Sequence, residues 1–197
     1  MKRIIYLFII FSGLITACQK TNDNNTVQQQ EYVVNATSST SWKYFSFAKN
    51  DTVTITDPAT SLDWDLAFQR YRIRTNGGID GPGNGSAANS YKKLQAGFDL
   101  LTTIPDTTTF VEDTNVEIAV QQGYAYYNIN PVLYSWFSIE LGANGTQIVP
   151  TDNIYFIKTA NGKYAKVWFK SYYNNSNTSG YVTFQYKYQA DGSRNIE

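Results

Sequence analysis

Arginine occurs at every second position in one segment of the chain, as Arg70, Arg72 and Arg74. Successive side chains of a β-strand point to opposite faces, so residues spaced by two project from the same face. A row of guanidinium groups can bind carboxylates or phosphates through paired hydrogen bonds. The segment is therefore a candidate anion-binding site. The alternative is a solvated strand face whose arginines pair with acids on a neighbouring strand.

The residue types that the sequence lacks exclude much catalytic and metal chemistry. It contains no histidine, one cysteine (Cys18) and one methionine (Met1). Ser-His-Asp and Cys-His catalysis cannot be assembled, and neither can a zinc site with thiolate or imidazole ligands. We therefore expect no catalytic residues, no metal site and no enzymatic activity.

Carboxylates and glycines offer weaker candidates. Asp63 and Asp65 flank Trp64 and should share one strand face, whereas a glycosidase needs carboxyl groups about 5 to 9 Å apart across a sugar-sized cleft. A polar strand edge around a core tryptophan is the favoured interpretation. The segment 81–85 is rich in glycine but lacks the Lys-Ser/Thr of a P-loop, which predicts a flexible surface loop. The acidic residues of segment 106–113 lack the spacing of an EF-hand loop.

The N-terminus has the order of a secretory signal peptide. Two basic residues precede an apolar run over residues 4–15, and small residues stand just before Cys18. The run is shorter than the roughly 20 residues that a membrane-spanning helix needs. Residues 14–18 resemble a bacterial lipoprotein lipobox. We expect residues 1–17 to be a lipoprotein signal peptide and a lipid on Cys18 to anchor the chain to the outer membrane, exposed at the cell surface. The alternative is an ordinary signal peptide with a chance cysteine.

The rest of the chain is predicted to be one domain on a tether. Residues 18–30 are polar and cannot bury enough apolar surface to order themselves, which predicts a flexible, disordered tether. Residues 31–197 are enough for one domain with a sizeable core. Lys and Arg together number 16, as do Asp and Glu, so no overall field indicates a nucleic-acid partner.

The domain is predicted to be all-β. It is rich in Tyr, Phe, Trp, Thr and Val, which suit a half-buried pleated surface. Many short strands suggest a single antiparallel β-sandwich or an irregular barrel-like domain, with a short helical insert within residues 87–101. The predicted strands span residues 41–47, 51–56, 63–74, 124–130, 135–141 and 181–188.

A β-hairpin is the strongest local prediction. Residues 154–160 and 163–169 are separated by Asn161-Gly162, a pair that favours a type I′ turn. A two-residue turn would pair Phe156 with Val167 and Tyr155 with Trp168. Large apolar residues would then lie on both faces, so the hairpin should be central and buried on both sides.

Several motifs together resemble the HmuY-like family of Bacteroidetes surface lipoproteins. The resemblance covers nearly the whole mature domain and is most specific in the second motif. The motifs are WKYFSF at 42–47, DWDLAFQRY at 63–71, RTNGG at 74–78, the segment 163–173, and GYVTFQY at 180–186.

The resemblance implies an all-β haemophore. Such a protein would take haem from host haemoproteins and pass it to a TonB-dependent outer-membrane transporter. Characterised haem binders of the family hold the iron with two histidines, or with methionines in some relatives, and the mature chain has neither. Tyrosinate is the obvious remaining ligand. The candidate ligand or cleft residues are Tyr124, Tyr126, Tyr127 and Tyr134, and the arginine row would bind the haem propionates.

Two other functions remain open at this level. A surface module could bind a glycan on exposed tryptophan and tyrosine rings, although core packing is the favoured use of each tryptophan. It could also bind a protein and no small ligand at all. The candidate stacking residues are Trp42, Trp64, Trp136 and Trp168.

Overall fold

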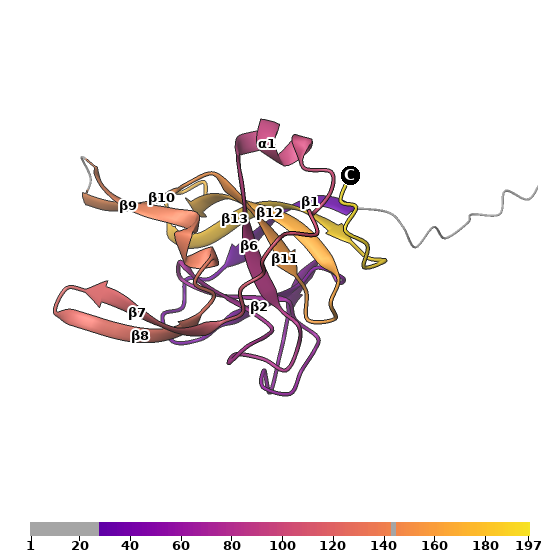
Figure 1. Ribbon diagram of the computed structural model, residues 1–197. Coiled ribbons are helices and arrows are strands. Elements are labelled where there is room, and N and C mark those ends of the chain that lie inside the picture. Colours follow the sequence, from indigo (N-terminus) through magenta and orange to yellow (C-terminus); the bar gives the residue numbers. More distant parts are fainter. Residues whose placement is uncertain (1–27, 143–144) are drawn as a thin grey trace, which may run out of the picture.

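The computed structural model describes residues 28–142 and 145–197, and its fold is all-β, as predicted (Figure 1). The predicted signal peptide, Cys18 and most of the predicted tether lie outside the described residues. Strand β1 begins at Gln28, so residues 28–30, at the end of the predicted tether, pair with β13. Within the described part of the chain, no helix is long and apolar enough to cross a membrane.

The larger sheet has five antiparallel strands in the order β1-β13-β12-β11-β6. Its inner strands are apolar on both faces, because one face packs on the second sheet and the other on a helix and the C-terminal segment. The strands are β1 (Gln28–Asn35), β6 (Ser86–Lys93), β11 (Asn153–Lys158), β12 (Tyr164–Tyr173) and β13 (Ser179–Gln189).

The smaller sheet has four strands in the order β3-β2-β4-β5 and packs face to face with the larger one. Aromatic rings fill the space between them. The Phe184 ring of β13 lies 5.2 Å from that of Phe45 and 5.6 Å from that of Phe68, centroid to centroid. Within the described residues the sheets form a sandwich and not a closed barrel. The strands are β2 (Lys43–Ser46), β3 (Asp51–Val53), β4 (Leu66–Gln69) and β5 (Arg72–Thr75).

Two further hairpins project from the same side of the sandwich (Figure 1). One consists of β7 (Thr114–Val120) and β8 (Gly123–Ile129), and the other of β9 (Phe137–Gly142) and β10 (Gly145–Pro150). A short 3-10 helix, η1 (Leu133–Trp136), connects them. Because β8, η1 and β9 are nearly continuous in sequence, the side chains at the bases of the two hairpins lie close together.

The helical insert is shorter than the segment in which we predict it. Only α1 (Leu94–Leu100) is helical, and the preceding residues form strand β6. Ala87 and Ala88 pair with Ile157 and Phe156 of β11, and Ala87 also forms an antiparallel bridge with Val111 on its other side. The Phe98 ring anchors α1 on the outer face of the larger sheet.

The predicted hairpin exists and is buried on both faces, but the predicted register is wrong by one residue. Tyr155 pairs with Val167, and Phe156 pairs with Lys166. The loop has three residues between Thr159 and Lys163, and only Gly162 has a positive φ, of 75°. Ala160 explains the longer loop, because its N–H donates to Asp65 and its carbonyl accepts from Asn84. These tertiary bonds override the local preference for a two-residue turn.

The segment predicted as one strand over residues 63–74 folds back on itself. Strands β4 and β5 pair through a two-residue turn at Arg70 and Tyr71, where Arg70 has a φ of 55°. The predicted row of three arginines is therefore wrong. Arg72 and Arg74 share one face of β5, whereas Arg70 lies in the turn and points elsewhere.

Asp65 and the glycine-rich segment also differ from expectation. Asp65 is buried and accepts hydrogen bonds from the N–H groups of Phe47 and Ala160, whereas Asp63 is exposed near Lys49, so the two acids do not share a face.

Segment 81–85 is closely packed: a Cβ added to Gly85 would lie 2.5 Å from the backbone of Asn76. The prediction of a flexible loop is therefore wrong.

Candidate functional site

An aromatic and cationic cluster lies where the two projecting hairpins leave the sandwich. The Arg72 guanidinium of β5 stacks over the Tyr127 ring of β8, 4.2 Å from its centroid. The Phe137 ring, at the start of β9, lies 4.9 Å from Tyr71 and 5.3 Å from Tyr134. The fold thus brings residues of the β4–β5 turn, both hairpins and η1 into one cluster.

Several polar groups of this cluster have no hydrogen-bond partner among the described residues. They include the hydroxyl groups of Tyr71, Tyr127 and Tyr134 and the buried Nε of Arg72. Burial raises the pKa of Tyr134, and the neighbouring Tyr71 hydroxyl raises it further, while the positive charge of Arg72 lowers it. The net effect is an upward shift, so the neutral phenol of Tyr134 is favoured and Arg72 only partly offsets the effect of burial.

The other two candidate tyrosines lie on the opposite face of the β7–β8 hairpin. Side chains alternate along β8, so Tyr124 and Tyr126 share a face that Tyr127 does not. Both are exposed, and the Tyr126 hydroxyl donates to Glu117 across the hairpin. The structure therefore places Tyr127 and Tyr134 together and leaves Tyr124 and Tyr126 on the outer surface.

The remaining two arginines hold the fold together. Arg70 donates to the carbonyl of Thr37 and to the hydroxyl of Ser179, which joins the β4–β5 turn to the larger sheet. Arg74 stacks over the Trp42 ring at 3.9 Å, and its Nε lies 3.2 Å from Asp80. Of the three candidate propionate-binding residues, only Arg72 lies in the aromatic cluster.

A buried polar network fixes the base of the β7–β8 hairpin. Asp113, just before β7, accepts from the N–H of Thr75 at 2.8 Å and from Nδ2 of Asn130 at 3.0 Å. The Asn130 side-chain oxygen in turn accepts from the N–H groups of Val132 and Leu133, so it starts η1 and positions Tyr134. Sequence reasoning missed Asp113 and Asn130; the only available signal was the Asn-Pro pair at 130–131, which favours a turn.

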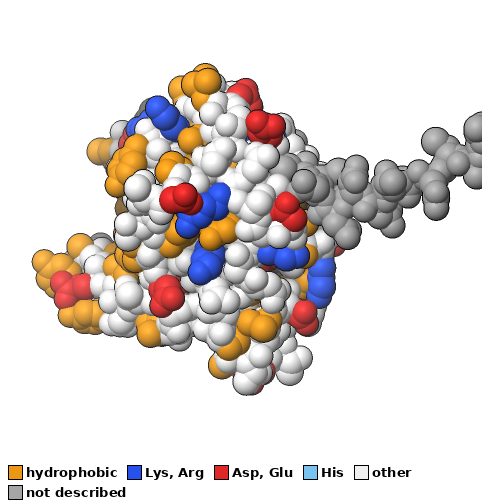
Figure 2. Space-filling model, turned by 45° about the vertical axis from the view of Figure 1, so that its right-hand side comes forward, with side chains coloured by type: hydrophobic (Ala, Val, Ile, Leu, Met, Phe, Trp, Pro, Cys, Tyr) orange, Lys and Arg blue, Asp and Glu red, His pale blue; other side chains and the backbone are white. Residues whose placement is uncertain are grey.

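Apolar side chains of both hairpins are exposed to solvent. Ile139 and Leu141 of β9 are 61% and 88% exposed, and Val120 at the end of β7 is 42% exposed. Figure 2 shows hydrophobic side chains gathered on the projection that carries β7 and β8, whereas charged side chains of both signs are intermixed elsewhere on that face. Clustered exposed apolar residues indicate a surface that meets a ligand or partner.

Three of the four tryptophans do not provide the exposed platforms that a glycan would stack on. Trp64 and Trp136 are fully buried and Trp168 is 9% exposed. Trp42 is partly exposed, but the Arg74 guanidinium lies over its ring. Trp64, Trp136 and Trp168 therefore cannot serve as stacking platforms, whereas Trp42 keeps part of its ring exposed.

Comparison with known proteins identifies the family. The model of the HmuY protein family matches residues 38–186, which is most of the chain. The chain belongs to the HmuY family. This confirms the resemblance carried by the sequence motifs. A comparison with curated proteins gave no match.

Solved structures of HmuY-like proteins share the fold. The apo HmuY analogue of Tannerella forsythia is 21% identical, with 85% of this chain and 99% of that chain covered and a TM-score of 0.63. A protein of Bacteroides vulgatus described as HmuY-like and haem binding is 23% identical, with 80% and 90% covered and a TM-score of 0.59. A protein of Bacteroides fragilis described as a lipoprotein is 21% identical, with 84% and 90% covered and a TM-score of 0.59.

Proposed function

We propose that this HmuY family protein is a surface lipoprotein that binds haem, or another tetrapyrrole, between its two projecting hairpins for uptake through an outer-membrane transporter. The observation that carries the proposal is the cluster of Arg72, Tyr127 and Tyr134 at the bases of hairpins with exposed apolar side chains. Membership of a family of binding proteins and the description of the B. vulgatus relative support it.

The chemistry of this cluster fits a tetrapyrrole. Haem has a flat apolar body and two carboxylates, so its site needs apolar walls and a cation. Ile139, Leu141 and Val120 would supply the walls, and the positive charge of the Arg72 guanidinium would attract a propionate. Ferric iron accepts a phenolate oxygen as an axial ligand. Tyr134 is the proposed ligand, because it has a free hydroxyl close to the positive charge of Arg72.

The proposal is tested by titrating the protein with haemin and following the Soret band. We expect saturable binding with the charge-transfer spectrum of a phenolate-ligated ferric haem. Tyr134→Phe should abolish that spectrum and weaken binding by at least about tenfold, the size of one lost charge-assisted contact. The matched control is Tyr124→Phe, which removes a hydroxyl from the outer face of the same hairpin region.

Two outcomes would contradict the proposal. An unchanged Soret band on adding haemin would exclude haem as a ligand. Equal effects of Tyr134→Phe and Tyr124→Phe would show that haem binds without the ligand named here. Binding of protoporphyrin IX without iron, at the same strength as haemin, would indicate a tetrapyrrole site in which no tyrosine ligates the metal.

A protein ligand is the second candidate function. The exposure of Leu141 and Ile139 at the end of a projecting hairpin favours it, because such residues commonly dock on a partner. The double variant Ile139→Ser/Leu141→Ser separates the two functions. Loss of haemin binding supports the haem site, whereas retained binding of haemin removes Ile139 and Leu141 from that site and leaves the hairpin tip available to a protein partner.

A further inference from the structure

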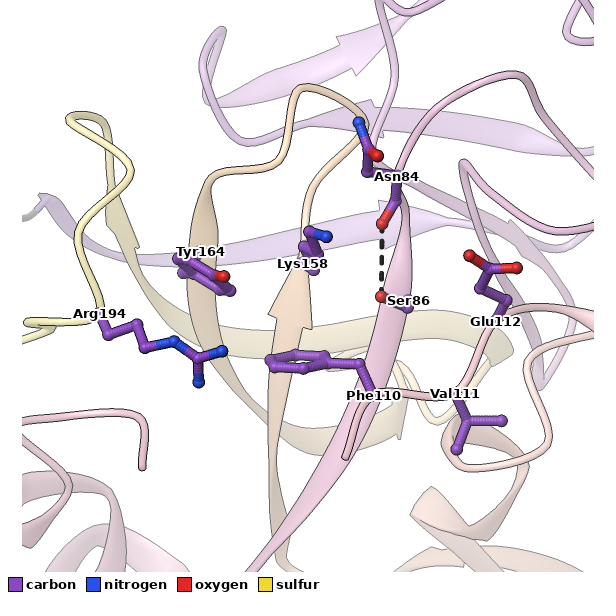
Figure 3. A pocket seen from close by; sticks show the side chains of 8 residues that line it. All are labelled: Asn84, Ser86, Phe110, Val111, Glu112, Lys158, Tyr164 and Arg194. Atoms are coloured by element: carbon purple, nitrogen blue, oxygen red, sulfur yellow. Dashed lines mark hydrogen bonds between the residues drawn. The ribbon is translucent and has the colours of Figure 1, made fainter. Parts of the chain in front are cut away.

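A hollow of about 450 Å³ lies on the sandwich, apart from the aromatic cluster at the bases of the two hairpins (Figure 3). It opens between β6, β11 and β12, with the segment before β7 on one side and the C-terminal segment on the other. None of its lining residues belongs to the aromatic cluster at the hairpin bases. Its volume falls in the range of small-molecule sites.

Two aromatic rings form the apolar part of the hollow. The ring centroids of Phe110 and Tyr164 lie 5.8 Å apart, with their planes tilted by 42°. Both rings are partly buried against a small cluster that contains Phe156 and Ile196, so their positions are fixed by packing. Such rings offer a face on which the C–H groups of a sugar or another saturated ring can pack.

A held guanidinium lies beside these rings. The Arg194 guanidinium lies 5.2 Å from the Tyr164 centroid, and Nη1 donates to the carbonyl of Pro105 at 2.7 Å. Its Nε lies 3.5 Å from Asp106. The other terminal nitrogen, Nη2, has no partner among the described residues. Figure 3 shows Arg194 and Phe110 extending toward one another across the hollow.

A second cation, Lys158, also lines the hollow. The Lys158 ammonium, at the end of β11, has no ion pair within the described residues, although the side chain is half-buried. The Tyr164 hydroxyl beside it is also without a hydrogen-bond partner there. Glu112 and Asn84 complete the lining with groups that can accept from or donate to hydroxyl groups.

We propose that this hollow binds an acidic sugar unit, with its carboxylate on Lys158 and Arg194 and its ring against Phe110 and Tyr164. Lys158 has no ion pair among the described residues, and Arg194, whose Nε faces Asp106, keeps Nη2 without a partner there; these two donors favour a ligand that carries a carboxylate. The rings and the hydroxyl-binding groups favour a sugar over phosphate. The sequence predicted stacking on tryptophan rings, three of which are buried in the fold. The proposed site uses the rings of Phe110 and Tyr164 instead.

The experiment is saturation-transfer NMR and calorimetric titration of the full chain with glucuronate, glucose and acetate. We expect saturable binding of glucuronate and binding at least tenfold weaker for glucose and for acetate. Lys158→Gln and Arg194→Gln should each weaken glucuronate binding about tenfold. The matched control is Lys187→Gln, a partly exposed lysine of β13 that does not line the hollow, which should bind as the unchanged protein does.

Each other result would overturn the proposal. Absence of glucuronate binding, or equal binding by the Lys158 and Lys187 variants, would exclude the site. If glucose bound as tightly as glucuronate, the ligand's carboxylate would contribute nothing to binding. If acetate bound as tightly as glucuronate, packing of the sugar on the two aromatic rings would contribute nothing. Haemin titration of Lys158→Gln should match that of the unchanged protein, so failure at this site is distinguishable from failure of the haem site.

Discussion

Asp113 is buried next to a second acid at the base of the β7–β8 hairpin. Burial raises its pKa to about 8 and also raises that of Asp80, whose proximity raises the pKa of Asp113 further. The guanidinium of Arg74 faces Asp80 and partly offsets its charge. At neutral pH Asp113 therefore carries a proton, and the hairpin is attached to β5 by a carboxylic acid and not by a carboxylate.

This protonation predicts a pH-dependent stability. The folded-state pKa of Asp113 is raised above its unfolded value, so the folded chain binds the proton more tightly and loses stability as pH rises toward 8. Between pH 6 and 8 the free energy of unfolding should fall by about 2 kcal/mol, most of it from Asp113, because Asp65, with a pKa of about 6, is already half ionised at pH 6. Urea unfolding at both pH values measures it.

Asp113→Asn provides the control for this effect. The variant removes the titrating group and should flatten the change in unfolding free energy between pH 6 and 8, even if it is less stable overall. A slope that persists in Asp113→Asn would assign the pH dependence to another group.

Helix α1 is held by a lysine of the strand beneath it. The helix has seven residues, too few to be stable alone. The buried Lys166 ammonium of β12 donates to the carbonyl oxygens of Phe98 and Leu101, where the helix ends and its carbonyls lack partners. Burial lowers the pKa of Lys166 to about 8. One strand residue thus supplies the C-terminal cap that the helix sequence does not contain.

Removal of this lysine should loosen α1 selectively. Lys166→Met keeps the length and apolar stem of the side chain but leaves two carbonyl groups without a donor. Hydrogen exchange of the amides of α1 should become at least tenfold faster, while that of β13 stays within a factor of two. Lys187→Met, which changes the cross-strand neighbour of Lys166, should leave α1 unchanged. Equal exchange of α1 in the two variants would argue against the cap.

The described part of the chain is a sandwich that supports two projecting hairpins on one side, with the hollow lined by Phe110 and Tyr164 among those on its surface. Its core is held by contacts between the two sheets, chiefly aromatic rings around Phe184. With one cysteine in the sequence, no internal disulfide can contribute. The packed core must therefore keep the domain folded without such a bond.

The proposed anchor is tested on the whole protein. Cys18→Ala should prevent lipid attachment and move the exported chain from the membrane fraction to the soluble fraction. Its haemin titration should be unchanged, because Cys18 precedes the first described strand by ten residues. Membrane retention of the variant would favour the ordinary signal peptide and another means of attachment.

The sequence predicted the all-β class, the central hairpin and the family, because alternation and aromatic content are local signals. It did not predict the register of that hairpin or the turn at Arg70, since tertiary bonds to Ala160 and from Arg70 decide them. At the candidate site, Tyr127, Tyr134 and Arg72 could be named from residue type alone. The structure places these three residues together and leaves Tyr124 and Arg74 outside the cluster. That arrangement depends on how β5 and β8 pack, which the sequence of either strand alone does not determine.

Strand β1 begins on the side of the sandwich opposite to the hairpins (Figure 1). Under the proposed function, a domain tethered through Cys18 would therefore present its hairpins away from the membrane, and a transporter in that membrane would lie in the other direction. The ten residues from Cys18 to Gln28 reach at most about 35 Å when extended. For that function, the domain would have to face away from the membrane to bind haem and turn toward the membrane to release it to a transporter. The length of the tether would then limit how readily haem is transferred.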